Sequence, residues 1–187
     1  MIEFNEEALQ KEARQRMLDA GIYITDEEEK KTAVRDFGLG RFEEIGLACL
    51  TYVNTDRVCS KEMVLWPWQI CPEHRHPYIN GKKGKQEIFR VRGGEMYLYV
   101  PGEKTPDAKC RIPKGKEDTF TVFHQIILKK GDMYVLDDDT LHWFQGGPEG
   151  VVVSEFSTAA VDQLDLFTDE DIGRDDDFLK LEYKLPE

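Results

Sequence analysis

The stretch 74-HRHPYINGKKGKQEIFRVRGG-94, with 131-GDMYVLDDDTLH-142 further along, decides the fold. His74 and His76 are two residues apart, so on a strand both imidazoles point to one face of a sheet. Glu87 opens the next apolar run after a Gly-rich turn, and antiparallel pairing of the two runs is expected to return its carboxylate to the histidines. Two neutral imidazoles and a carboxylate suit Mn, Fe, Co, Ni or Zn. The stretch therefore predicts a metal site inside a β-sheet.

Further short runs of apolar or alternating residues, separated by Gly, Pro, Asn and Asp, surround these two stretches. They are typical of short antiparallel strands joined by tight turns. We expect strands at 46–53, 63–70, 87–93, 95–102, 123–131, 133–137, 141–147 and 151–158. Such a series predicts a mainly β protein, a sandwich or barrel, in preference to a βαβ fold.

Two helical patterns precede the strands. Residues 5–20 carry apolar side chains at helical spacing behind a possible N-cap, Asn5, and a capping box at Thr25 predicts a second helix near 26–36. We expect these helices to pack on the barrel or on a dimer partner. The acidic C-terminal segment is expected to be a solvated surface and not a metal site. The predicted organisation is one domain over 1–187, with a helical extension at 1–40, a β-barrel at 41–160 and an acidic segment at 161–187.

The composition excludes several classes of protein. The 187 residues carry a net charge of −12, which disfavours nucleic acid and anionic membranes as partners. No apolar run approaches the roughly 20 residues of a membrane span, and the N-terminus does not have the pattern of a signal peptide. The four cysteines form no CxxC pair. We therefore expect a cytoplasmic protein with reduced thiols.

The two stretches also resemble the paired motifs of the cupins. His74-x-His76, Glu87 and Gly94 match the first motif, and the run from Gly131 to His142 has the spacing of the second, with Asp at two positions where Pro and Gly are usual. This resemblance implies a cupin-type antiparallel β-barrel, a jelly roll. It also implies that four residues hold one metal ion: His74, His76, Glu87 and His142.

A closer resemblance covers about residues 40–165. The stretch 66-WPWQICPEHRHPYINGKKGKQEIFRVRGGEMYLYVPGE-103, with LHWFQGG and SEFST downstream, is similar to the D-lyxose isomerase family of cupins. The resemblance implies a divalent metal, usually Mn²⁺, with Co²⁺, Fe²⁺ or Zn²⁺ as alternatives. It implies a small-molecule sugar substrate, with D-lyxose converted to D-xylulose and often D-mannose to D-fructose. It also implies a cytoplasmic homodimer.

Two residues are candidates for the proton transfer that such an isomerisation needs. Lys85 lies two residues before Glu87, so it is expected on the same face, and the family resemblance also places a functional lysine there. Burial beside a metal is expected to lower its pKa. Glu155 shares a strand face with Val151 and Val153. On a buried face, a carboxylate needs a polar partner or a catalytic role, because burying its charge costs free energy. The plainer alternative is that both residues are surface groups.

Other assignments remain open at this stage. A cupin that isomerises a sugar phosphate would need convergent basic groups, which could come from Lys82, Lys83, Lys85, Arg90 and Arg92, although a solvated turn is the simpler interpretation. An iron-dependent cupin dioxygenase and a non-enzymatic sugar-binding cupin are further alternatives, because one fold hosts many functions. We expect Glu73 to point away from the metal, and Asp137–Asp139 to form the turn before His142.

Overall fold

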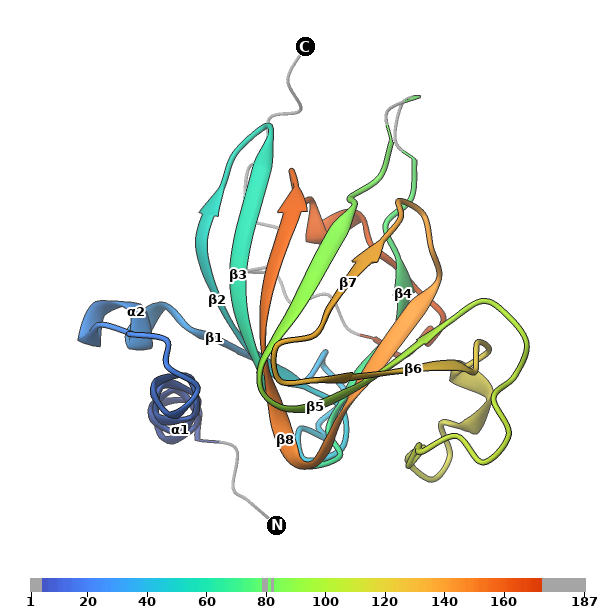
Figure 1. The fold of residues 1–187 in the computed structure, drawn as a ribbon, viewed down its shortest axis with the longest axis horizontal. Helices are drawn as coiled ribbons and strands as arrows, with labels where there is room; N and C mark the ends of the chain where they lie inside the picture. Colours follow the sequence, from blue (N-terminus) through green and yellow to red (C-terminus); the bar gives the residue numbers. More distant parts are fainter. Residues whose placement is uncertain (1–4, 79–80, 82, 173–187) are drawn as a thin grey trace.

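The computed structural model of the protein describes residues 5–78, 81 and 83–172. Within this part of the chain, nine strands form one antiparallel sheet that curls around an interior, with the two α-helices on its outside (Figure 1). The prediction of a mainly β, cupin-type antiparallel barrel is confirmed. In the described residues, no helix has both the length and the apolar character needed to cross a membrane.

The sheet is built around one strand, β8, which pairs with β3, β4 and β5. The strand order is β1-β2-β3-β8-β4-β9, and β5 also pairs with β6 and β7. The helices are α1 (Glu6–Asp19), α2 (Asp26–Lys31), η1 (Glu117–Thr119) and η2 (Asp162–Leu164). The strands are β1 (Ala33–Arg35), β2 (Leu47–Asn54), β3 (Val58–Leu65), β4 (Ile70–Arg75), β5 (Glu87–Val100), β6 (His124–Lys129), β7 (Met133–Leu136), β8 (His142–Thr158) and β9 (Leu166–Phe167).

The two longest strands, β5 and β8, were each predicted as two shorter strands. That prediction is wrong, because the glycines between the predicted halves bend the strands without ending them. Register shifts lie on both sides of Gly93 and Gly94, as expected for β-bulges. Gly94 has a φ of +75°, and a Cβ there would lie 2.1 Å from the carbonyl oxygen of Gly150. The motif glycine therefore allows the two backbones to approach closely.

Helix α1 covers the outer face of the sheet. The side chain of Asn5 accepts a hydrogen bond from the backbone N–H of Ala8 at 3.1 Å, so the predicted N-cap is confirmed. The buried face of the helix packs with side chains of β2, β3 and β8 in one cluster that includes Leu9, Met17 and Val64. Of the two expected surfaces for this helix, the barrel is the one observed. A second apolar cluster fills the interior, and it includes Met63, Phe89, Val91, Phe144 and Val153.

Two further boundaries differ from the prediction. Helix α2 ends at Lys31, before the predicted 36, and β1 follows at once inside the segment that was expected to be helical. The predicted strand at 63–70 is the end of β3 and the start of β4, separated by a turn in which Trp68 has a φ of +63°. Pro67 favours such a turn. The histidine pair therefore starts on a separate strand, β4.

Candidate active site

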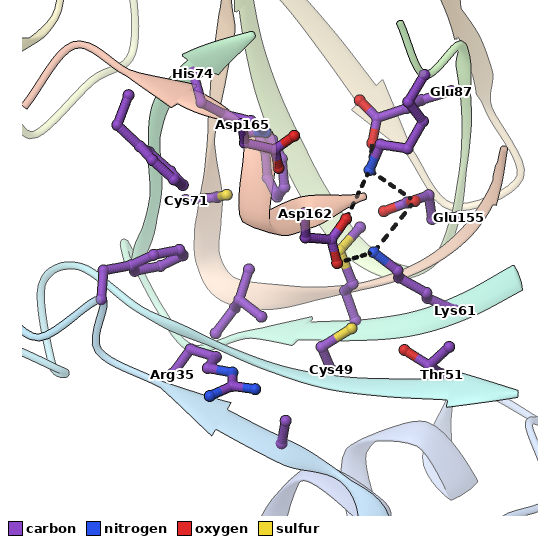
Figure 2. A pocket seen from close by; sticks show the side chains of 17 residues that line it. Arg35, Cys49, Thr51, Lys61, Cys71, His74, Glu87, Glu155, Asp162 and Asp165 are labelled. Atoms are coloured by element: carbon purple, nitrogen blue, oxygen red, sulfur yellow. Dashed lines mark hydrogen bonds and ion pairs between the residues drawn. The ribbon is translucent and has the colours of Figure 1, made fainter. Parts of the chain in front are cut away.

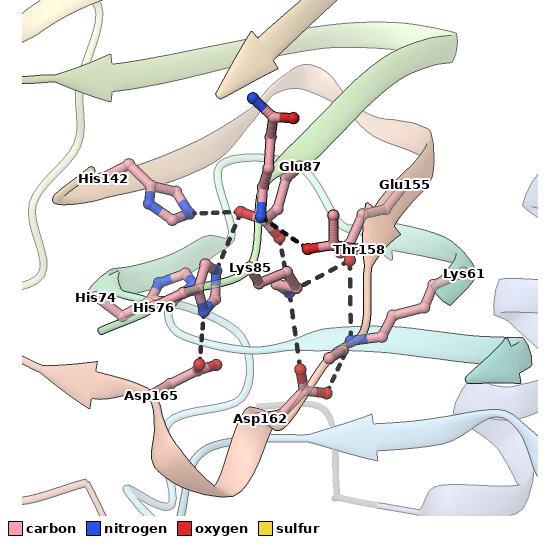
Figure 3. A network of polar contacts seen from close by, with 12 residues as sticks. Lys61, His74, His76, Lys85, Glu87, His142, Glu155, Thr158, Asp162 and Asp165 are labelled. Carbon is pink, nitrogen blue, oxygen red and sulfur yellow. Dashed lines mark hydrogen bonds and ion pairs between the residues drawn. The ribbon is translucent and has the colours of Figure 1, made fainter. Parts of the chain in front are cut away.

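Three histidines meet inside the barrel. His74 lies on β4, His76 lies one residue beyond its end, and His142 opens β8 directly opposite His74 in the β4–β8 register. All three are buried, and their potential ligand atoms lie within 4.8 Å of one another. The HxH spacing thus places two rings on one face, and the cross-strand partner supplies the third (Figure 3). This cluster could hold a metal ion.

The hydrogen bonds of the histidines leave their Nε2 atoms facing one another. The Nδ1–H groups of His74 and His142 donate to the carbonyl oxygens of Pro72 (2.8 Å) and Thr140 (2.9 Å). Burial, together with repulsion from the other two histidines, holds the pKa of His74 well below its usual range, so this ring is neutral. A neutral imidazole that donates through one nitrogen and offers the other is the usual form of a metal-binding histidine.

Glu87 brings a carboxylate to the same point. Its Oε2 atom lies 3.1 Å from His76 Nε2 and 3.3 Å from His142 Nε2. The route differs from the prediction, because β4 and β5 do not pair with each other in the described sheet; both pair with β8. Glu87 is the first residue of β5, and it reaches the histidines across the interior.

The electrostatics of this cluster fit a bound cation. His142 Nε2 is buried and makes no hydrogen bond within the described part of the chain. Burial opposes a charge on His76, but the attraction of Glu87 together with the hydrogen bonds to Asp165 and Glu87 raises the pKa of His76 to about 9. Without a metal ion, His76 therefore carries a proton, which puts positive charge at the point where a divalent ion would put it. Three imidazole nitrogens and one carboxylate oxygen form a donor set that Mn, Fe, Co, Ni and Zn accept.

Lys85 and Glu155 both face the interior next to this cluster. Lys85 Nζ lies 2.7 Å from Glu87 Oε1 and 3.3 Å from Glu155 Oε1, and both residues are buried. The alternative that they are surface groups is therefore wrong. The expected lowering of the Lys85 pKa is also wrong: burial opposes the ammonium, but attraction by Glu155, Glu87 and Asp162 raises its pKa well above the usual range. Lys85 is thus a charged hydrogen-bond donor beside Glu87.

Three residues near the cluster were missed by the sequence analysis. Lys61, on β3, is buried and lies 2.7 Å from Asp162 Oδ2, and Asp165 accepts a 2.5 Å hydrogen bond from His76 Nδ1. The expectation that the acidic segment is only a solvated surface is wrong for these two aspartates; residues 173–187 lie outside the described residues. The inward orientation of Lys61 could have been inferred from the sequence, because Lys61 shares one strand face with Cys59 and Met63.

A cavity of about 150 Å³ adjoins these charged groups (Figure 2). Its polar wall carries Lys61, His74, Lys85, Glu87, Glu155, Asp162 and Asp165. The rest of the wall is largely apolar, with Arg35 and Thr51 as polar members, and it includes Phe37, Leu47, Met63, Phe144 and Phe167. A small polar molecule in this space would contact both the charged groups and an apolar surface.

The other assignments near the site agree with the structure. Glu73 points away from the histidines, and its carboxylate accepts hydrogen bonds from Thr121, Val122 and Thr168. Asp138 and Asp139 form the turn before His142, and Asp139 has a φ of +57°. These acidic residues therefore bind or shape other parts of the chain and do not contribute to the histidine cluster.

Comparisons with known proteins agree on one family. A family model described as D-lyxose isomerase matches residues 27–179. The D-lyxose/D-mannose isomerase of Thermosediminibacter oceani is 54% identical over 166 residues, which cover 89% of this chain and 92% of that protein. The D-lyxose ketol-isomerase of a Thermofilum species is 55% identical over 170 residues, covering 89% and 94%.

The fold is shared with more distant sugar isomerases of known structure. The L-ribose isomerase of Acinetobacter sp. DL28, solved in complex with L-ribose, superposes with a TM-score of 0.77 at 18% identity, covering 89% of this chain and 92% of the other. The L-ribose isomerase of Cellulomonas parahominis gives 0.75 at 20% identity, covering 89% and 92%. With the family match over residues 27–179 and relatives above 50% identity, this chain belongs to the D-lyxose isomerase family.

Proposed function

We propose that the protein is a metal-dependent aldose–ketose isomerase that interconverts D-lyxose and D-xylulose, and also D-mannose and D-fructose. One observation carries the proposal: Lys85 bridges Glu87, at the histidine cluster, and Glu155 on the cavity wall. A charged donor and a carboxylate thus lie beside a possible cation site. The names of the relatives support the sugars.

In this proposal His74, His76, Glu87 and His142 hold the divalent ion. When bound, the ion would act as a Lewis acid for the sugar oxygens at C1 and C2. Lys85 would stabilise the negative charge that develops on one of these oxygens by donating a hydrogen bond from its ammonium group. The Glu155 carboxylate, held by Lys85, would move the proton between C1 and C2 as the general base and then the general acid.

Two alternatives from the sequence are less favoured by the geometry. A phosphate handle would need several basic groups that converge on the cavity, but Arg90 is exposed, Lys83 pairs with Asp138 away from it, and Arg35 is the one arginine among the described lining residues. The two lysines on the cavity wall, Lys61 and Lys85, are already paired with carboxylates. A non-enzymatic sugar-binding protein would have no need of a buried Lys85–Glu155 pair beside a cation site, because burying charges costs free energy.

Incubation with a panel of sugars tests the function. The metal-loaded protein is mixed with D-lyxose, D-mannose, D-xylose and several sugar phosphates in D2O, and products are followed by NMR. We expect D-xylulose from D-lyxose and D-fructose from D-mannose, with loss of activity after chelation and recovery with Mn²⁺. A protein that stays active without metal, or that converts only sugar phosphates, would contradict the proposal.

Three finer statements complete the proposal. Mn²⁺ is the native metal, the protein is a homodimer, and it acts in the cytoplasm. Elemental analysis of the purified protein tests the first statement. No metal is added during purification, because Mn²⁺ competes poorly with Zn²⁺ for nitrogen ligands. Light scattering in solution tests the second, and cell fractionation tests the third.

A further inference from the structure

Four charged side chains form a closed ring on the cavity wall. Lys85 Nζ lies 3.3 Å from Glu155 Oε1, which lies 3.9 Å from Lys61 Nζ. Asp162 closes the ring, with Oδ2 2.7 Å from Lys61 Nζ and Oδ1 3.7 Å from Lys85 Nζ. Positive and negative groups alternate, so each member has an opposite charge on both sides (Figure 3).

The ring joins parts of the chain that lie far apart in sequence. Lys61 stands directly opposite Glu155 in the β3–β8 register, so both side chains point to the interior. Lys85 precedes β5, and Asp162 begins η2 in the C-terminal segment. Neither Lys61 nor Asp162 belongs to a cupin motif, and the ion pairs of Lys61 are with Glu155 and Asp162.

We propose that Lys61 and Asp162 are positioning residues for the isomerisation: together they hold Lys85 where it stabilises the developing oxyanion and Glu155 where it transfers the proton. The roles rest on the proposed function, since they require Lys85 and Glu155 to be catalytic. Lys61 and Asp162 act through their ring neighbours.

The charges around Lys85 show why Lys61 and Asp162 affect its position. Three carboxylates, those of Glu87, Glu155 and Asp162, share two lysines. Without the Lys61 ammonium, all three would compete for Lys85. Without the Asp162 carboxylate, Lys61 would lose its 2.7 Å partner and turn to Glu155, drawing it away from Lys85. Either change displaces a reacting group, and a displacement of about 1 Å can slow catalysis on the order of 100-fold.

The test compares Asp162→Asn, Lys61→Met, Lys61→Arg and the Asp162→Asn/Lys61→Met double variant in the full chain loaded with Mn²⁺. Asp171→Asn is the matched control, because Asp171 lies on the same segment and pairs with Lys116, away from the ring. The measurements are kcat and KM for D-lyxose, bound metal per chain and the melting temperature.

We expect kcat to fall at least tenfold in Asp162→Asn and Lys61→Met, with KM within threefold of the wild type and the bound metal unchanged. Lys61→Arg keeps the charge and is expected to recover part of kcat. The double variant is expected to be no slower than the slower single variant, since the two residues act as one unit. Asp171→Asn is expected to match the wild type.

Unchanged kcat in Asp162→Asn would overturn the positioning roles, and this variant keeps the proposal testable if Lys61→Met does not fold. A rise in KM at constant kcat would also overturn them, because it would mean that the residues bind the sugar directly. So would a loss of kcat that only follows a loss of metal or of folded protein. If the wild type isomerises no sugar in the panel, the proposed function itself fails.

Discussion

Removal of one negative charge behind His76 should weaken metal binding. Asp165 Oδ1 accepts a 2.5 Å hydrogen bond from His76 Nδ1, and both residues are buried. In Asp165→Asn the amide oxygen can still accept this bond, so the ring keeps its orientation while the nearby charge disappears. Mutation of such an outer hydrogen-bond partner typically costs 10- to 100-fold in metal affinity, or about 1.4–2.7 kcal/mol.

The assay is a titration of metal-free protein with Mn²⁺ or Co²⁺, followed by calorimetry or by the visible absorption of bound Co²⁺. Asp169→Asn is the control, because it removes a buried carboxylate of the same segment that pairs with Lys116 and not with a histidine. We expect Asp165→Asn to raise the Kd by 10- to 100-fold with a stoichiometry of about one, and Asp169→Asn to leave the Kd unchanged. An unchanged Kd in Asp165→Asn would refute the reasoning.

Four further outcomes are expected. His142→Ala should bind less than one metal per chain and lose activity; full occupancy by elemental analysis would remove His142 from the ligand set. Lys85→Met and Glu155→Gln should each keep the metal and lose about 100-fold or more in kcat, and near-normal turnover of either variant would end its catalytic role. Metal affinity should rise with pH, because below its pKa of about 9 His76 holds a proton that the metal must displace. Calorimetry should show the affinity rising about tenfold per pH unit between pH 6 and 8, and an affinity independent of pH would contradict this. Gly94→Ala should lower the free energy of unfolding by more than about 2 kcal/mol, because its φ is +75° and the added Cβ meets the β8 backbone; an unshifted urea midpoint would show that the backbones can separate.

The histidine cluster was predictable in part from strand geometry and in part from the resemblance to the cupin motifs. His74 and His76 share a face by strand periodicity, and the motif spacing placed His142 and Glu87 nearby. The shared strand face of Glu155 and the valines favoured its burial but left a surface position open. The partner strand of Glu87 was not predictable, because the Gly-rich segment between β4 and β5 has the sequence of a hairpin turn, yet both strands pair with the distant β8.

The outer residues of the site were less accessible from sequence. Lys61 carried the same signal as Glu155, a charge among apolar residues on one strand face, but its strand was predicted to begin at 63, after it. Asp162 and Asp165 belong to an irregular segment whose path depends on tertiary contacts, such as the bond from Thr168 to Glu73. In composition alone, these two aspartates, which face the cavity, look the same as fully exposed ones.

The placement of Asp165 has a consequence for the order in which the site is assembled during synthesis. His74, Glu87 and His142 are synthesised before Asp162 and Asp165, which reach the cavity only after β8 is complete. A nascent or truncated chain that ends near residue 160 would contain all four proposed ligands but not the carboxylate behind His76. Under the proposed function, such a chain would bind the ion more weakly than one that extends past Asp165, so tight metal loading would follow synthesis of this C-terminal segment.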